Sequence, residues 1–118
     1  MREDTLENEA FVVRFGAMRL EDLQEAIARC FTTLGFYGLS FYGENRLTVA
    51  DIAALAKKPH TQIRKARIGQ LRSSGFEIRR YGRFPHLTLR FNEKPADIDL
   101  TRLIGVFDDP ESNPHPVE

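Results

Sequence analysis

Hydrophobic residues in the first part of the chain follow a strand pattern, then a helix pattern, then a strand pattern again. Phe11–Phe15 is β-branched and aromatic and is followed by Gly16, which predicts a short strand. From Arg19 onward, apolar residues recur at steps of three and four, which predicts an amphipathic helix. Its apolar stripe consists of Leu20, Leu23, Ile27, Cys30, Phe31 and Leu34, so Cys30 is expected to be buried. The aromatic segment 36–43 predicts a second strand.

The middle of the chain predicts two further helices. Thr48 and Asp51 form a helix-start signature, and Pro59 ends the helix that follows them. Residues 61–74 are expected to form the second of these helices, which ends at Gly75.

A hairpin and a last helix complete the pattern. Residues 76–81 and 84–91 predict two strands that turn near Gly82. Residues 97–107 carry apolar side chains at helical spacing and predict a final amphipathic helix. The sequence therefore predicts a small α+β fold, in which a strand-helix-strand unit comes first.

Length and composition indicate a single domain. The chain has 118 residues, of which 42% are hydrophobic and 29% are charged, and this suits one core. We expect the domain over residues 10–108, with a flexible N-terminus over 1–9 and a flexible proline-rich tail over 109–118. No apolar run is long enough to span a membrane, and we expect no secretory signal in the acidic N-terminal segment.

The residues that bind metals and cofactors are few. Cys30 is the only cysteine, so the sequence predicts no internal disulfide and no cysteine-based zinc cluster and favours a reduced, cytoplasmic protein. The three histidines have no ligand spacing, and no glycine-rich phosphate loop follows a strand. We therefore expect no metal site and no cofactor.

Charge is distributed unevenly, although 17 basic and 17 acidic side chains cancel. Residues 1–56 have a net charge of −4, residues 57–83 of +8 and residues 84–118 of −4. A basic block of this kind predicts an anion-binding surface and favours nucleic acid as the partner. That prediction requires the basic side chains to form one continuous outward-facing patch. The alternative is a solvated face that pairs with acidic segments of the same chain.

Residues 47–91 combine a short helix that contains Ile52 and Ala53, a turn at 58–60, a polar-led second helix and a hairpin with a basic tip. This arrangement resembles a winged helix-turn-helix. The resemblance implies that the second helix enters the major groove while the hairpin lies along the backbone or the minor groove. The residues expected to bind nucleic acid are His60, Thr61, Gln62, Arg64, Lys65 and Arg72 on the helix, and Arg79, Arg80 and Arg83 at the hairpin tip. The leading hypothesis is a small nucleic-acid-binding module, with DNA as the favoured ligand.

An enzyme is the first alternative. Arg14, Ser40 and His86 lie on three predicted strands that one small sheet could bring together. An arginine that holds a phosphate, a hydroxyl and a histidine for proton transfer would suit a small toxin that acts on RNA or on a nucleotide, as in toxin-antitoxin systems. The structural alternative is that Arg14 is an edge charge, Ser40 a packing residue and His86 a hydrogen-bonded sheet residue.

A protein-interaction domain is the second alternative. In this case the basic block would bind an acidic protein partner. A homodimer could form through the last helix or through the aromatic cluster Phe36, Tyr37, Phe41 and Tyr42. The same cluster is otherwise expected to pack in the core or to stack on unpaired bases.

Overall fold

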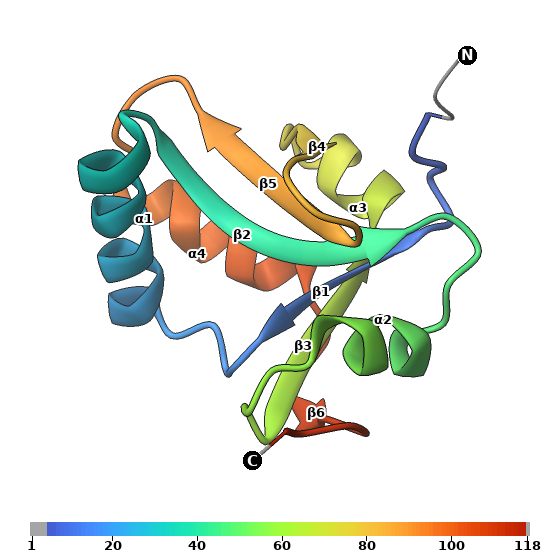
Figure 1. The fold of residues 1–118 in the computed structure, drawn as a ribbon. Helices are drawn as coiled ribbons and strands as arrows, with labels where there is room; N and C mark the ends of the chain where they lie inside the picture. Colours follow the sequence, from blue (N-terminus) through green and yellow to red (C-terminus); the bar gives the residue numbers. More distant parts are fainter. Residues whose placement is uncertain (1–4, 118) are drawn as a thin grey trace.

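One antiparallel sheet with four helices makes up residues 5–117, the part of the chain that the computed structural model describes (Figure 1). The strands are β1 (Phe11–Phe15), β2 (Tyr37–Glu44), β3 (Gln62–Arg67), β4 (Ile78–Arg80), β5 (His86–Phe91) and β6 (Glu111–Ser112). The helices are α1 (Leu20–Leu34), α2 (Val49–Ala56), α3 (Ile68–Ser73) and α4 (Asp97–Val106). The strand order is β4-β5-β2-β1-β3-β6, with every neighbouring pair antiparallel. The fold is α+β, as predicted.

The two faces of the sheet carry separate cores because successive side chains of a strand point to opposite faces. The main core lies between the sheet and α1, α3 and α4, and includes Val12, Leu23, Leu39, Phe41, Ile68, Leu71, Leu87, Leu89, Leu100 and Leu103. A smaller core lies under α2 and consists of Val13, Phe15, Ile52, Ala53 and Ile63. In Figure 1, α4 lies behind the sheet and α2 lies in front of its lower part. The second face is therefore covered only in part.

Most predicted elements are confirmed. The strand-helix-strand unit is present as β1, α1 and β2, the hairpin as β4 and β5, and the last helix as α4. The start of α2 follows from a capping box, in which the Thr48 hydroxyl accepts from Asp51 N and the Asp51 carboxylate accepts from Thr48 N, both at 3.1 Å. Among residues 5–117, no helix has the length and apolar character needed to cross a bilayer.

The helix predicted over residues 61–74 is wrong in its first half. Gln62–Arg67 form β3, which pairs with β1 on one side and with β6 on the other, and α3 begins only at Ile68. Ile63 and Ala66 are both buried, but they face different cores. A strand that buries both faces can thus show the spacing of three that is typical of a helix. Between α2 and the hairpin, the structure therefore has a strand and a short helix where a winged helix-turn-helix would have one longer helix. Membership of that family stays a prediction.

The terminal segments, which the sequence predicts to be flexible, contact the rest of the fold within the part of the chain that the structure describes. Leu6 is 5% exposed and joins the main core, and β6 pairs with β3. Asn113 is 6% exposed and its side-chain nitrogen donates to the carbonyl of His60 at 2.8 Å. Residues 1–4 and 118, on which part of that prediction falls, lie outside the described residues.

The sheet ends in very short strands on both sides. β4 has three residues and β6 has two. Neither edge strand therefore presents a long row of backbone N–H and C=O groups, although β6 pairs with only two residues of β3 and β4 with three residues of β5.

Candidate functional site

Part of one sheet face lies beyond α2 without a helix over it. Antiparallel partners share a face, so the pairs Ser40–Thr88 and Tyr42–His86 place these side chains on the face opposite the main core. Figure 1 shows β2 and β5 crossing the front of the molecule there. Ser40 is exposed, and Tyr42 and His86 are half-buried.

Aromatic rings form a continuous row across this open face. The ring of Tyr42 meets that of His86 at 5.4 Å between centroids, His86 meets Tyr81 at 6.2 Å, and Tyr81 meets Phe36 at 6.0 Å. We call Tyr42, His86, Tyr81 and Phe36 the aromatic row. The Arg90 guanidinium lies over Phe36, 4.4 Å from the ring centroid, and Tyr81 is 46% exposed. The row thus offers ring surface and a cation to solvent.

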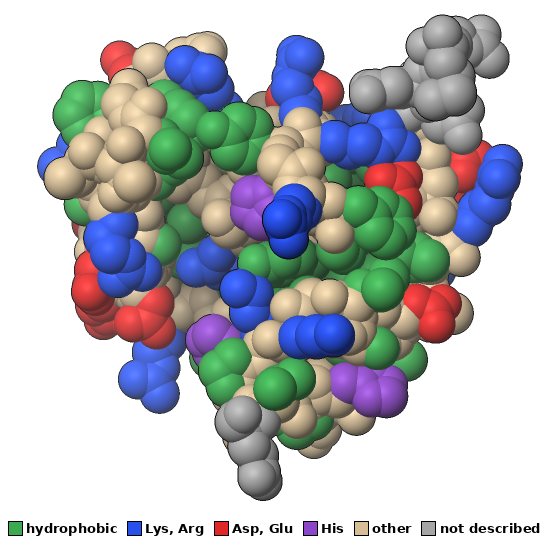
Figure 2. Space-filling view, viewed as in Figure 1, with side chains coloured by type: hydrophobic (Ala, Val, Ile, Leu, Met, Phe, Trp, Pro, Cys, Tyr) green, Lys and Arg blue, Asp and Glu red, His purple; other side chains and the backbone are tan. Residues whose placement is uncertain are grey.

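A cleft opens at one end of the row because β1 and β2 separate. The two strands pair only from Phe11–Glu44 to Val13–Tyr42, whereas β1 continues along β3 as far as Phe15–Ile63. The resulting cleft has a volume of about 510 Å³. Its lining comes from α1, β1, β2 and the segment between α2 and β3, and includes Arg14, Arg29, Cys30, Thr33, Ser40, Tyr42, Lys58 and His60. Figure 2 shows Lys, Arg and His side chains around a hollow beside α1.

Arg14 occupies the gap between the separating strands. Its Nη1 donates to the carbonyl of Ser40 at 2.7 Å, and its guanidinium lies 5.9 Å from the ring centroid of Phe41. Burial lowers the pKa of Arg14; nearby Arg29 acts in the same direction, while Tyr42 and Asp22 oppose it. Arginine nevertheless stays protonated in proteins. Arg14 forms no ion pair with any residue in 5–117, so a poorly solvated positive charge faces the cleft.

Three further basic side chains surround Arg14. Arg29 pairs with Glu25 at 3.0 Å, but their side chains are 68% and 70% exposed, so this pair is weak. Lys58 Nζ lies 5.3 Å from the ring centroid of Tyr42, and His60 lies beside Phe15 with 6.4 Å between ring centroids. We call Arg14, Arg29, Lys58 and His60 the cationic cleft.

Among the described residues, carboxylates lie on one side of the cationic cleft, where Glu25 pairs with Arg29. A second hollow of about 310 Å³ shares Arg14, Arg29 and His60 and is also lined by Asp22 and Glu25. The lining of the first cleft includes no Asp or Glu among the described residues. The charged side chains are therefore all basic in the first cleft, on the side of β2, and both basic and acidic in the second hollow, on the far side of Arg14.

The residues predicted to bind nucleic acid do not form one patch. Arg64 lies against the end of α4 and donates to the carbonyls of Asp108, Phe107, Ile104 and Ala17. Lys65 pairs with Glu111 at 3.3 Å, and Arg72 donates to Asn8 at 2.8 Å. These basic side chains stabilise the chain's own segments.

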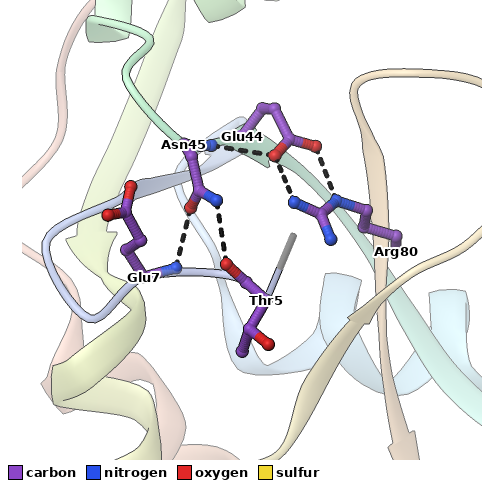
Figure 3. A network of polar contacts seen from close by, with 5 residues as sticks. All are labelled: Thr5, Glu7, Glu44, Asn45 and Arg80. Carbon is purple, nitrogen blue, oxygen red and sulfur yellow. Dashed lines mark hydrogen bonds and ion pairs between the residues drawn. The ribbon is translucent and has the colours of Figure 1, made fainter. Parts of the chain in front are cut away.

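The three arginines predicted to form the basic hairpin tip also differ in their surroundings. Arg80 Nε donates to the Glu44 carboxylate at 2.7 Å, as Figure 3 shows, and Glu44 also accepts from the backbone of Asn45. Arg79 and Arg83 are exposed. Thr61 and Gln62 are exposed beside β6. Of the residues predicted to bind nucleic acid, only His60 lines the cationic cleft.

The three residues of the enzyme alternative are brought near one another only in part. Arg14 and Ser40 share the cleft and a hydrogen bond. His86 lies one strand away, where its Nδ1 is within hydrogen-bond distance of the Tyr81 carbonyl. In residues 5–117, no group of three His, Cys, Asp or Glu side chains is placed to hold a metal ion.

Sequence reasoning did not identify Arg29, Lys58 or Thr33 as site residues. Cys30 was expected in the core, but it is half-buried and lines the cleft. The apolar stripe of α1 is wider than its buried part, since Phe31 and Leu34 are 45% and 51% exposed. Helical periodicity marks the stripe but not the place where a neighbouring strand turns away from it.

Comparisons with known proteins give no further assignment. No protein-family model matches the chain, and searches of curated proteins and of solved structures found no significant match.

Proposed function

We propose that this protein binds single-stranded nucleic acid across the aromatic row and the cationic cleft. The observation that carries the proposal is that the row leads into the cleft through Tyr42, which belongs to both. Proteins that bind single strands combine rings on which bases stack with a positively charged groove for the phosphates. An open antiparallel sheet face suits unpaired bases, which can lie flat on exposed rings.

The proposal keeps nucleic acid as the partner but moves the surface. The first half of the segment predicted to be a helix in the major groove is strand β3 in the structure. Arg64 and Lys65, which were expected to contact nucleic acid, contact other parts of the chain. Single strands are therefore the favoured ligand in place of duplex DNA. A cytoplasmic location remains part of the proposal, on the basis of the lone Cys30.

Fluorescence anisotropy with labelled RNA and DNA of equal length tests the proposal. We expect single strands to bind at least about tenfold more tightly than a duplex, and Tyr81→Ala to weaken binding by about five- to fiftyfold, since one stacked base contributes roughly 1–3 kcal/mol. Phe31→Ala is the matched control, because Phe31 is 45% exposed and Tyr81 is 46% exposed, but Phe31 lies on α1 against Tyr37. Equal binding of duplex and single strand, or equal losses in both variants, would overturn the proposal.

A toxin-type enzyme that acts on RNA or on a nucleotide is the second candidate function. The observation that favours it is that His60 lines the same cleft as Arg14 and Ser40. A histidine can transfer protons near neutral pH while an arginine holds the phosphate. Incubation of labelled RNA with the purified protein tests this candidate. Cleavage that His60→Ala abolishes without loss of strand binding supports it, and intact RNA after long incubation contradicts it.

A further inference from the structure

We infer that the cationic cleft is a pocket for a terminal phosphate, in which Arg14 binds a phosphomonoester at the end of a strand or on a free nucleotide. The inference rests on the proposed function, because it names the part of the ligand that the cleft receives. It goes further in assigning one chemical group to one side chain.

Arg14 lacks an ion-pair partner among the described residues 5–117. Its charge is partly removed from water, and it donates to the carbonyl of Ser40, an uncharged acceptor. A charge held in this way is costly unless an opposite charge approaches it. One of its several N–H groups is used by Ser40, and an arginine can bind two oxygens of a phosphate side by side. Phosphate is therefore the group that fits this guanidinium.

The lining of the cleft around the Arg14 guanidinium supplies further groups that bind phosphate. Arg29 and Lys58 add two positive charges, and Thr33 and Ser40 add hydroxyl groups. A phosphomonoester carries a charge of about −1.5 to −2 near neutral pH, whereas each internal phosphate of a strand carries a single charge. Several cations around one point favour the group with the higher charge.

The cleft is large enough for more than a phosphate group. A volume of about 510 Å³ lies in the range of pockets that hold small organic ligands. Ala26, Leu34 and the Tyr42 ring supply apolar wall beside the cations. The cleft can therefore take a sugar and a base together with the phosphate.

Acidic side chains on the far side of Arg14 favour the end of a strand over its middle. A strand that continued past Arg14 would enter the hollow lined by Asp22 and Glu25. Carboxylates repel the next phosphate, so the polyanion is expected to stop at Arg14. In the other direction the aromatic row leads away from the cleft and offers rings to the following bases.

The experiment compares ends on an otherwise identical single strand with the wild-type protein. Five ligands are titrated under the same salt conditions. Three are strands, with a 5′-phosphate, with a 3′-phosphate and with hydroxyl groups at both ends, and the other two are adenosine monophosphate (AMP) and adenosine. We expect one phosphorylated end to bind about tenfold more tightly than the hydroxyl ends, as for a charge-assisted contact. A preference for AMP over adenosine assigns the phosphomonoester of a free nucleotide as a ligand too.

The outcomes separate this inference from the proposed function. Strands that bind equally with all three ends, together with AMP no better than adenosine, overturn the pocket and leave strand binding intact. AMP binding without any strand binding supports the pocket and overturns the proposed function.

Variants assign the effect to Arg14. Arg14→Lys is expected to lose most of the preference for the phosphorylated end, because an ammonium lacks the planar fork of the guanidinium. Arg102→Ala is the control: Arg102 lies on α4, outside the lining of the cleft, over the ring of Phe76 at 4.8 Å. If Arg14→Lys keeps the full preference while folded, judged by its circular dichroism, the assignment to Arg14 is wrong.

Discussion

Single arginines in this chain have contrasting surroundings. Arg64 donates to three carbonyls at the end of α4, where oriented carbonyl groups favour a positive charge, and to the carbonyl of Ala17. Arg14 donates to one carbonyl, and its charge faces an open cleft. The residue type is the same, but Arg64 holds segments of the chain together while the guanidinium of Arg14 lines a cleft.

Replacing each of these arginines with methionine should separate the two roles. We expect Arg14→Met to change the free energy of unfolding by less than about 1 kcal/mol or to raise it, because a poorly solvated charge is removed and a thioether can pack on Phe41. Arg64→Met should cost about 2–4 kcal/mol, because several carbonyls lose a charged donor. Urea unfolding followed by circular dichroism measures both. Similar losses in the two variants would contradict this reading of Arg14.

Glu44 is expected to make the stability of the fold depend on pH. Hydrogen bonds from Arg80 hold the pKa of Glu44 below its usual value, the Asn45 amide acts in the same direction, and burial opposes both. A carboxyl whose pKa is lower in the folded state stabilises the fold above its unfolded pKa. That contribution is lost as the pH falls through the lower, folded value.

Comparison of the wild type with Glu44→Gln over a range of pH tests this dependence. At pH 7 we expect the wild type to be more stable by about 1 kcal/mol, the upper end for partly exposed pairs. The difference should shrink as the pH falls below about 4.5, the ordinary value for this carboxyl. Thermal unfolding at each pH measures it, with Glu93→Gln as the control for a glutamate that is exposed. A difference that stays constant from pH 7 to pH 3 would be inconsistent with the Arg80 contact.

At the scale of elements, sequence reasoning succeeds where the signal is local. Thr48 and Asp51 bind each other's backbone at the start of α2, so the cap can be seen in the sequence. The turn of the β4–β5 hairpin and the period of α4 are local in the same sense. Elements of this kind were predicted correctly.

The errors fall on segments whose structure depends on distant neighbours. β3 is a strand because β1 lies on one side and β6 on the other, and β6 is more than forty residues further along the chain. The cationic cleft exists because β2 pairs with β1 only from Tyr42 to Glu44 and lies apart from it before Tyr42, which no periodicity records. Arg14 and His60 were among the predicted residues, but the cleft that joins them could not be predicted.

Asn113 links the C-terminal segment to the cleft. Its side chain donates to the His60 carbonyl at 2.8 Å, and its backbone N–H donates to Thr61 at 2.9 Å. Asn113→Ala is expected to cost about 1 kcal/mol of folding free energy, because the part-buried carbonyl of His60 loses its donor.

We expect the same variant to weaken binding of the phosphorylated strand, because Lys58 and His60 lose their fixed position. Anisotropy measured well below the midpoint of thermal unfolding checks this effect. Asn92→Ala is the control, as Asn92 is exposed after β5. Binding that is unchanged in a measurably destabilised Asn113→Ala would show that the segment does not position the cleft.

At the scale of the whole molecule, the balanced total charge hides a local field. Net charge is zero, and several basic side chains are neutralised by contacts such as Lys65–Glu111 and Arg80–Glu44. The cationic cleft keeps its charge because the carboxylates nearest to it, Asp22 and Glu25, lie on one side only. Long-range attraction is therefore weak, and binding should depend on a few close contacts.

The salt dependence of strand binding measures how many phosphates these contacts neutralise. For single strands the logarithm of the affinity falls by about 0.7 per decade of salt for each phosphate contact. Removing Arg29 and Lys58 together should therefore reduce the slope by about 1.4. Anisotropy titrations at three salt concentrations check this, with Arg102→Ala as the control. A slope that is the same in the double variant and the wild type would place the phosphates elsewhere.

The short strands at both sheet edges also bear on how the protein behaves at high concentration. A three-residue β4 and a two-residue β6 give an incoming chain almost no template on which to extend the sheet. Strand exchange and fibril growth, which both need such a template, are thereby disfavoured. If copies of this chain associate, they must meet through side chains, so their assembly depends on surface composition and can be altered without disturbing the fold.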